Sequence, residues 1–152
     1  LLYRRLGNSF GARKRATGTM PGYYFERVAQ MLRLNGRYQI LKDGDKLLEL
    51  GTGWLHWEAL TSRLFFDIEA VLFDVWDNRQ LSGLKNYVTQ LDGMIDKLDV
   101  DKRRIDRAHG LIEDIKKADR FDELYRRLWV RNVFDPHRGT RQCYKKSLYI
   151  VD

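Results

Sequence analysis

The stretch Lys46–Asp77, KLLELGTGWLHWEALTSRLFFDIEAVLFDVWD, decides the expected fold. It contains a short apolar run over 46–50, a Gly-x-Gly turn, a helix-like segment over 54–66 and a second apolar run over 70–73. Short apolar runs of this kind are typical of strands in a parallel sheet that is covered on both faces. A strand, a helix and a strand within about 30 residues predict a βαβ unit with parallel neighbouring strands.

Two features indicate a ligand-binding site: the turn after the first apolar run and the residue after the second apolar run. Gly51 and Gly53 let the backbone approach a ligand at a distance where any side chain would collide with it. Asp74 ends the second apolar run, and a carboxylate at a strand tip can accept hydrogen bonds from a ribose diol. The pattern therefore predicts an adenosine-type cofactor in a crevice at the strand ends, with Asp77 as the alternative ribose ligand.

The segment Glu49-Leu50-Gly51-Thr52-Gly53, followed by a run that closes on Asp74, resembles the class I S-adenosylmethionine-dependent methyltransferases. Their first motif is an acidic residue and then Gly-x-Gly at the turn out of the first strand. The resemblance covers residues 23–77. The sequence departs from the family pattern at Leu55, which occupies the place of a third glycine. Trp54 directly after the second glycine is similar to a subset in which His-Pro often follows, but Leu55-His56 follows here.

The resemblance implies a set of residues that bind the cofactor, S-adenosylmethionine. Gly51 and Gly53 would pass beneath the cofactor, Glu49 would orient its methionine end, and Asp74 would bind the ribose hydroxyls. A third acidic motif near the adenine is expected after a third strand, where NVFDP offers Asp135. The full set that we expect is Glu49, Gly51, Thr52, Gly53, Trp54, Asp74 and Asp135.

The expected fold is α/β, a Rossmann-like three-layer sandwich whose mostly parallel sheet carries helices on both faces. Residues 1–22, rich in Gly, Arg, Ser and Thr, predict a basic arm or loop, and residues 23–152 form the expected cofactor-binding domain. Apolar spacing predicts helices over 23–41 and between 81 and 128. We expect the domain to be incomplete and to end after its fourth strand.

Two further strands are expected near the end of the chain, over 129–134 and 148–151. The resemblance implies that the acceptor pocket and the catalytic base follow the fourth strand, so no catalytic residue is assigned. The chain starts with Leu1 rather than Met, which a longer open reading frame would explain.

The amino-acid composition limits which partners and which cellular location we expect for the protein. The 152 residues include 28 basic and 21 acidic side chains, a net charge of +7, and 43% of the residues are hydrophobic. A basic balance attracts anionic partners, yet no nucleic-acid-binding signature accompanies it, so a small-molecule acceptor is favoured over nucleic acid. No apolar run reaches the roughly 18 residues of a membrane-spanning helix. The single cysteine, Cys143, excludes an internal disulfide and favours a cytoplasmic protein.

Two other functions stay open on the sequence alone: an NAD-type dinucleotide-binding oxidoreductase and a non-catalytic Rossmann-like binding module. The dinucleotide fingerprint needs a glycine three residues after the second glycine, and His56 stands there. We interpret His56 as a polar residue at the helix start, His109 as a surface residue and His137 as a loop residue. No spacing of His and Cys indicates zinc.

Overall fold

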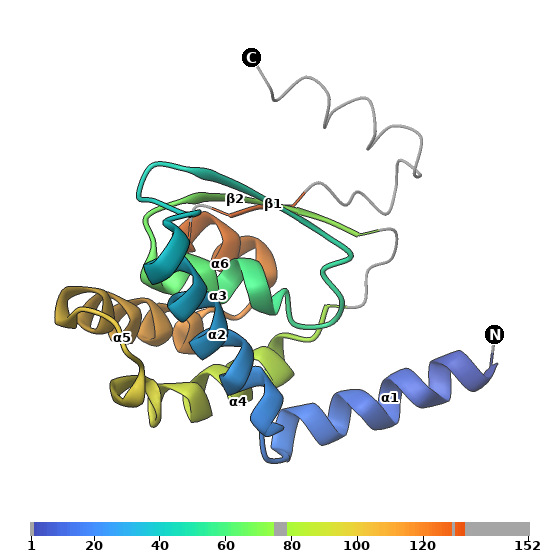
Figure 1. Cartoon of the computed structure of the whole chain (residues 1–152). Helices are drawn as coiled ribbons and strands as arrows, with labels where there is room; N and C mark the ends of the chain where they lie inside the picture. Colours follow the sequence, from blue (N-terminus) through green and yellow to red (C-terminus); the bar gives the residue numbers. More distant parts are fainter. Residues whose placement is uncertain (1, 75–78, 129, 133–152) are drawn as a thin grey trace.

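The computed structural model describes residues 2–74, 79–128 and 130–132 (Figure 1). Within these ranges most residues are helical, and the strands form one small sheet. The elements in chain order are α1 (Leu2–Thr17), α2 (Gly22–Tyr38), β1 (Lys46–Leu50), α3 (Trp57–Phe65), β2 (Glu69–Phe73), α4 (Leu81–Asp92), the 3₁₀ helix η1 (Ile95–Lys97), α5 (Lys102–Lys117), α6 (Phe121–Leu128) and β3 (Val130–Asn132).

The predicted βαβ unit is confirmed. β1 pairs with β2 in parallel, with Lys46 opposite Glu69 and Leu50 opposite Phe73, and α3 connects the two strands. β3 lies on the other side of β2, also parallel, so the strand order is β1-β2-β3. The carboxyl ends of β1 and β2 therefore lie side by side at one edge of the sheet.

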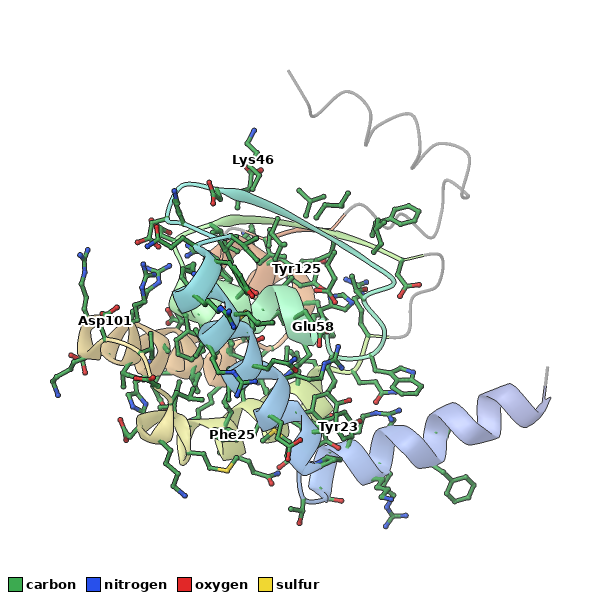
Figure 2. All side chains as sticks on the ribbon, viewed as in Figure 1. Tyr23, Phe25, Lys46, Glu58, Asp101 and Tyr125 are labelled. Carbon is green, nitrogen blue, oxygen red and sulfur yellow. The ribbon has the colours of Figure 1, made fainter. Side chains whose placement is uncertain are left out.

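The expectation of a Rossmann-like three-layer sandwich is wrong, because the described helices lie on one face of the sheet (Figure 1). Ala70 and Leu72 point to that face and are fully buried, whereas Leu48 and Leu50 on the opposite face are 57% and 68% exposed. Figure 2 shows Lys46 extending from this outer face, away from the helices. Right-handed crossovers that step in one direction, from β1 to β2 to β3, place their helices on the same face.

The first 22 residues also differ from the expected basic arm or loop, because α1 covers Leu2–Thr17. Leucine, arginine, lysine and alanine favour helix strongly enough to outweigh the glycines of this segment. Its carboxyl-terminal end packs against α4, while the rest extends away from the other helices (Figure 1). The packing is close at Gly83, where a Cβ atom would lie 3.0 Å from the Cβ of Arg15.

The helix predicted over 23–41 is confirmed as α2, which continues through Asn35-Gly36 and ends at Tyr38. The Asn35 side chain fixes the chain beyond the helix end: its Nδ2 donates to the Leu41 carbonyl at 2.9 Å, and its Oδ1 accepts from the Leu41 N–H at 2.6 Å. Gln39 adopts the left-handed conformation at the helix end.

The core fills the space between the helices and the inner face of the sheet. Helices α3, α4, α5 and α6 and strand β2 all contribute large, fully buried side chains, as shown by Leu60, Leu64, Leu72, Leu84, Ile112 and Leu124. No helix in the described part of the chain is both long enough and apolar enough to cross a membrane.

Candidate cofactor site

The loop over residues 51–56 leaves β1 at the carboxyl end of the sheet and leads into α3. Gly51 has a φ of +71° and Gly53 a φ of +63°, in the left-handed region where a side chain causes strain. A Cβ atom at either position would meet no heavy atom of the described residues within 4 Å. Glycine is therefore needed here for backbone conformation, and no residue that the structure describes fills the space beside Gly51 or Gly53.

Asp74 follows β2 directly and reaches across to this loop. Its Oδ2 accepts a hydrogen bond from the Gly53 N–H at 2.9 Å. The Gly51 N–H donates to the Phe73 carbonyl at 2.8 Å, which continues the parallel ladder to the end of the strands. Two predicted site residues that are 21 positions apart are thus in direct contact. The ribose role of Asp74 stays a prediction.

Thr52 and Trp54, the other predicted loop residues, have different environments. Thr52 is buried, and its carbonyl accepts from the His56 N–H at 3.2 Å, which tightens the loop into a turn. Trp54 keeps 39% of its surface exposed, and its carbonyl accepts from the Gln80 N–H at 2.9 Å. Trp54 is therefore the loop side chain with most surface available to a ligand.

Glu49 lies on the inner face of β1, and its carboxylate reaches the first turn of α3. Its Oε2 accepts from the Ala59 N–H at 2.7 Å. His56, at the start of α3, provides no side-chain cap, so Glu49 takes that role from the neighbouring strand. The positive end of the helix dipole favours an acidic group at this position. No local sequence pattern indicates this helix-capping contact.

The environment of Glu49 shifts its protonation. Burial away from water raises the pKa of the Glu49 carboxyl from 4.5 to about 7, against the opposing effect of the Ala59 hydrogen bond. The negative charges of Glu58 and Asp74 act in the same direction as burial, and Arg27 acts against it. The group therefore titrates near neutral pH.

A Glu49→Gln variant is expected to change how stability depends on pH. The folded chain binds the Glu49 proton more tightly than the unfolded chain does. The stability that this proton contributes is therefore fully present below pH 4.5 and is lost as pH rises through about 7. Glutamine keeps a carbonyl acceptor for Ala59 but does not titrate. A difference of 2.5 units between 7 and 4.5 sets an upper limit of about 3 kcal/mol on this loss.

Urea unfolding of both chains at pH 5 and pH 8 measures the effect. We expect Glu49→Gln to gain stability relative to the unmodified chain as pH rises. The exposed Glu26→Gln exchange is the matched control and should follow the unmodified chain at both pH values. An unchanged stability difference between Glu49→Gln and the unmodified chain would contradict the raised pKa.

His56 lies at the start of α3, as interpreted from the sequence, and it is buried. Its Nδ1 lies 2.6 Å from the hydroxyl of Tyr125, and the two rings stack with centroids 5.8 Å apart. Figure 2 places Tyr125 among the helices beneath the sheet. This pair ties the glycine loop to α6. Local sequence patterns could not indicate it, because the partners are 69 residues apart.

The aromatic residue Trp57 is part of the core rather than of the loop surface. It is 2% exposed, and its ring meets Tyr24 edge to face at 5.1 Å and Tyr87 at 6.4 Å. His109 lies partly exposed on α5 and pairs with Asp92 of α4 at 2.7 Å. That carboxylate, as the main cause, raises the pKa of His109. These residues stabilise helix packing.

A hollow of about 730 Å³ lies at the opposite, amino-terminal end of the strands, lined by Gly44, Asp67 and Val130 among others. Its buried cation, Arg63, donates from Nε to the Leu128 carbonyl at 2.6 Å and forms an ion pair with Asp67 at 2.8 Å. Ligands of parallel α/β sheets bind at the carboxyl ends of the strands. We therefore assign this hollow a structural role and place the candidate site at the glycine loop.

Several predicted residues lie outside the described residues, namely Asp77, Asp135, His137, Cys143 and the strand expected over 148–151. Within the described ranges, no three His, Cys, Asp or Glu side chains gather closely enough to hold a metal ion. Comparisons with protein-family models, with curated proteins and with solved structures gave no match to this chain.

Proposed function

We propose that the chain binds S-adenosylmethionine at the carboxyl ends of β1 and β2 and contributes the cofactor-binding part of a methyltransferase. The carrying observation is the 2.9 Å hydrogen bond from the Gly53 N–H to Asp74, which joins the two motifs that the family resemblance is based on. A carboxylate at the tip of the second strand is a suitable acceptor for ribose hydroxyls.

The surroundings of α3 favour S-adenosylmethionine over a dinucleotide. A Rossmann-type dinucleotide site places the pyrophosphate at the amino end of the helix after β1. Here the Glu49 carboxylate occupies that end through its contact with Ala59. His56, where the dinucleotide fingerprint needs glycine, is buried against Tyr125. S-adenosylmethionine carries no pyrophosphate and does not need this helix end.

The chemistry that the cofactor supplies when bound is a sulfonium-activated methyl group, so the protein mainly aligns donor and acceptor. In this chain Gly51 and Gly53 keep the loop surface open, and Asp74 would hold the ribose. Trp54 exposes part of its indole beside Gly53, where it would contact the cofactor. The proposed acceptor is a small molecule of unidentified class, and the proposed location is the cytoplasm.

Calorimetric titration of the full chain with S-adenosylmethionine, S-adenosylhomocysteine and NAD tests this function. We expect both adenosyl compounds to bind and NAD to bind more weakly or not at all. Preferential binding of NAD would favour the oxidoreductase alternative. Binding of none of the three would favour the non-catalytic module and would contradict the proposal.

A further inference from the structure

Arg15 of α1 contacts Trp54, the residue that follows the second glycine of the loop. Its guanidinium carbon lies 3.8 Å from the centroid of the Trp54 indole ring, a cation–π contact. Its Nε donates to the Gln80 Oε1 at 2.6 Å. The Gln80 N–H in turn donates to the Trp54 carbonyl at 2.9 Å. These three residues form a closed ring of contacts that holds both the indole and the backbone of Trp54.

The end of α1 that carries Arg15 is itself fixed on α4. Asn86 Nδ2 donates to the carbonyls of Arg15 and Gly18, both at 2.7 Å. Gln90 donates to the Gly18 carbonyl at 3.1 Å and accepts from the Met20 N–H at 2.8 Å. Four hydrogen bonds thus attach residues 15–20, the end of α1 and the segment after it, to two side chains of α4. Arg15 therefore projects from a rigid support.

The glycine loop needs such support. Glycine gains more conformational freedom in an unrestrained chain than any other residue, and ordering it costs binding free energy. Gly53 is directly followed by Trp54, so a fixed Trp54 restricts the loop from its downstream side. On the upstream side Gly51 is held by its hydrogen bond to Phe73. The loop is thus restrained on both sides before any ligand arrives.

We propose that Arg15 is a positioning residue for the cofactor loop: by stacking on Trp54 and binding Gln80, it keeps Gly53 and Trp54 in the ligand-binding conformation. The ligand part of this inference rests on the proposed function, whereas the ordering of the loop does not. It gives α1 a role in the site, although sequence reasoning assigned the first 22 residues to an arm.

Three single variants of the full chain test the proposal. Arg15→Gln removes the cation and the stacking, and Arg15→Lys keeps the cation but loses the planar guanidinium. Arg13→Gln is the matched control, because Arg13 is an exposed basic residue on the same helix. Amide hydrogen exchange at Gly53 and His56 reports the order of the loop, because both N–H groups are hydrogen-bonded.

We expect Arg15→Gln to speed exchange at Gly53 and His56 and to weaken S-adenosylhomocysteine binding roughly tenfold, the size of a partly buried cation–π contact. Arg15→Lys should lie between Arg15→Gln and the unmodified chain in both measurements. Arg13→Gln should match the unmodified chain. A general loss of stability would speed exchange across α3 and α5 as well, which we do not expect.

Unchanged exchange in Arg15→Gln, or equal effects in Arg13→Gln, would overturn the positioning role. Faster exchange with an affinity within about twofold of the unmodified chain would also overturn it, because loop order would then not limit binding. If the unmodified chain binds neither adenosyl compound, the proposed function fails. Hydrogen exchange then decides the loop-ordering role by itself, with faster exchange in Arg15→Gln supporting it.

Discussion

Gly51→Val is expected to abolish measurable binding of S-adenosylmethionine, the largest effect of any single change in the chain. Valine is β-branched and strongly disfavours the positive φ of +71° at this position. Its side chain would also enter the space beside the loop, where a Cβ atom meets nothing within 4 Å in the described part of the chain. The structural cost is about 1–2 kcal/mol of stability, so the chain should still fold. Calorimetric titration measures the binding.

Gly44→Val is the matched control for this variant. Gly44 has a φ of +94° and open space around its Cβ position, as Gly51 does, but it lies in the turn before β1, at the opposite end of the strand. We expect Gly44→Val to lose similar stability and to bind S-adenosylmethionine normally. Equal binding by Gly51→Val and the unmodified chain would show that the ligand does not approach this loop.

Asp74→Ala is expected to weaken S-adenosylmethionine binding roughly hundredfold, because charge-assisted hydrogen bonds to ribose hydroxyls would be lost. The variant also removes the acceptor of the Gly53 N–H, which loosens the loop. Asp74→Asn keeps a neutral acceptor for Gly53 and should lose less affinity than Asp74→Ala. Titration calorimetry of both variants separates the role of the charge from that of the loop contact.

Asp43 provides a control for the structural part of this effect. Its Oδ1 accepts from the Asp67 N–H at 2.8 Å, in the loops at the amino-terminal ends of β1 and β2. Asp43→Ala should lower stability while leaving cofactor affinity unchanged. Asp77→Ala should also bind normally. If Asp77→Ala loses binding and Asp74→Ala retains it, the ribose assignment to Asp74 is wrong.

The local elements of the fold could be predicted from the sequence because short-range signals determine them. The apolar runs over 46–50 and 70–73 became β1 and β2, and the spacing between them allowed only one crossover helix. The sequence also predicted that Gly53 and Asp74 lie at the ends of these two strands, and adjacent parallel strands bring their carboxyl ends together; the hydrogen bond between the two residues was not predicted. These predictions needed no information about distant residues.

The layer arrangement could not be predicted in this way. An apolar run that includes residues of both faces, such as Leu48 and Leu50 on the outer face, indicates a strand that is buried on both sides. Here only one face of the sheet carries described helices. Which face a crossover helix covers depends on the direction in which the strands are added, and periodicity does not contain that information. The apolar runs therefore predicted the two strands correctly, but they predicted wrongly that helices cover both faces of the sheet.

The side-chain contacts within the site could not be predicted from the sequence either. Glu49 meets Ala59, His56 meets Tyr125 and Arg15 meets Trp54 only because distant segments pack together. For α1, the glycines favoured an arm or loop, yet helix-favouring residue types and contacts with α4 together stabilise a helix. Each of these contacts joins two elements, so residue type and spacing alone could not reveal it.

The most direct measurement is a ¹⁵N-resolved NMR titration of the full chain with S-adenosylmethionine. We expect the largest shift changes at the amides of Gly51, Gly53 and Asp74, which together mark the carboxyl ends of β1 and β2. The amide of Gly44, at the opposite end of the sheet, should stay unchanged. Shift changes centred on Gly44 and Glu69, or no saturable change at any amide, would contradict a cofactor site at the glycine loop.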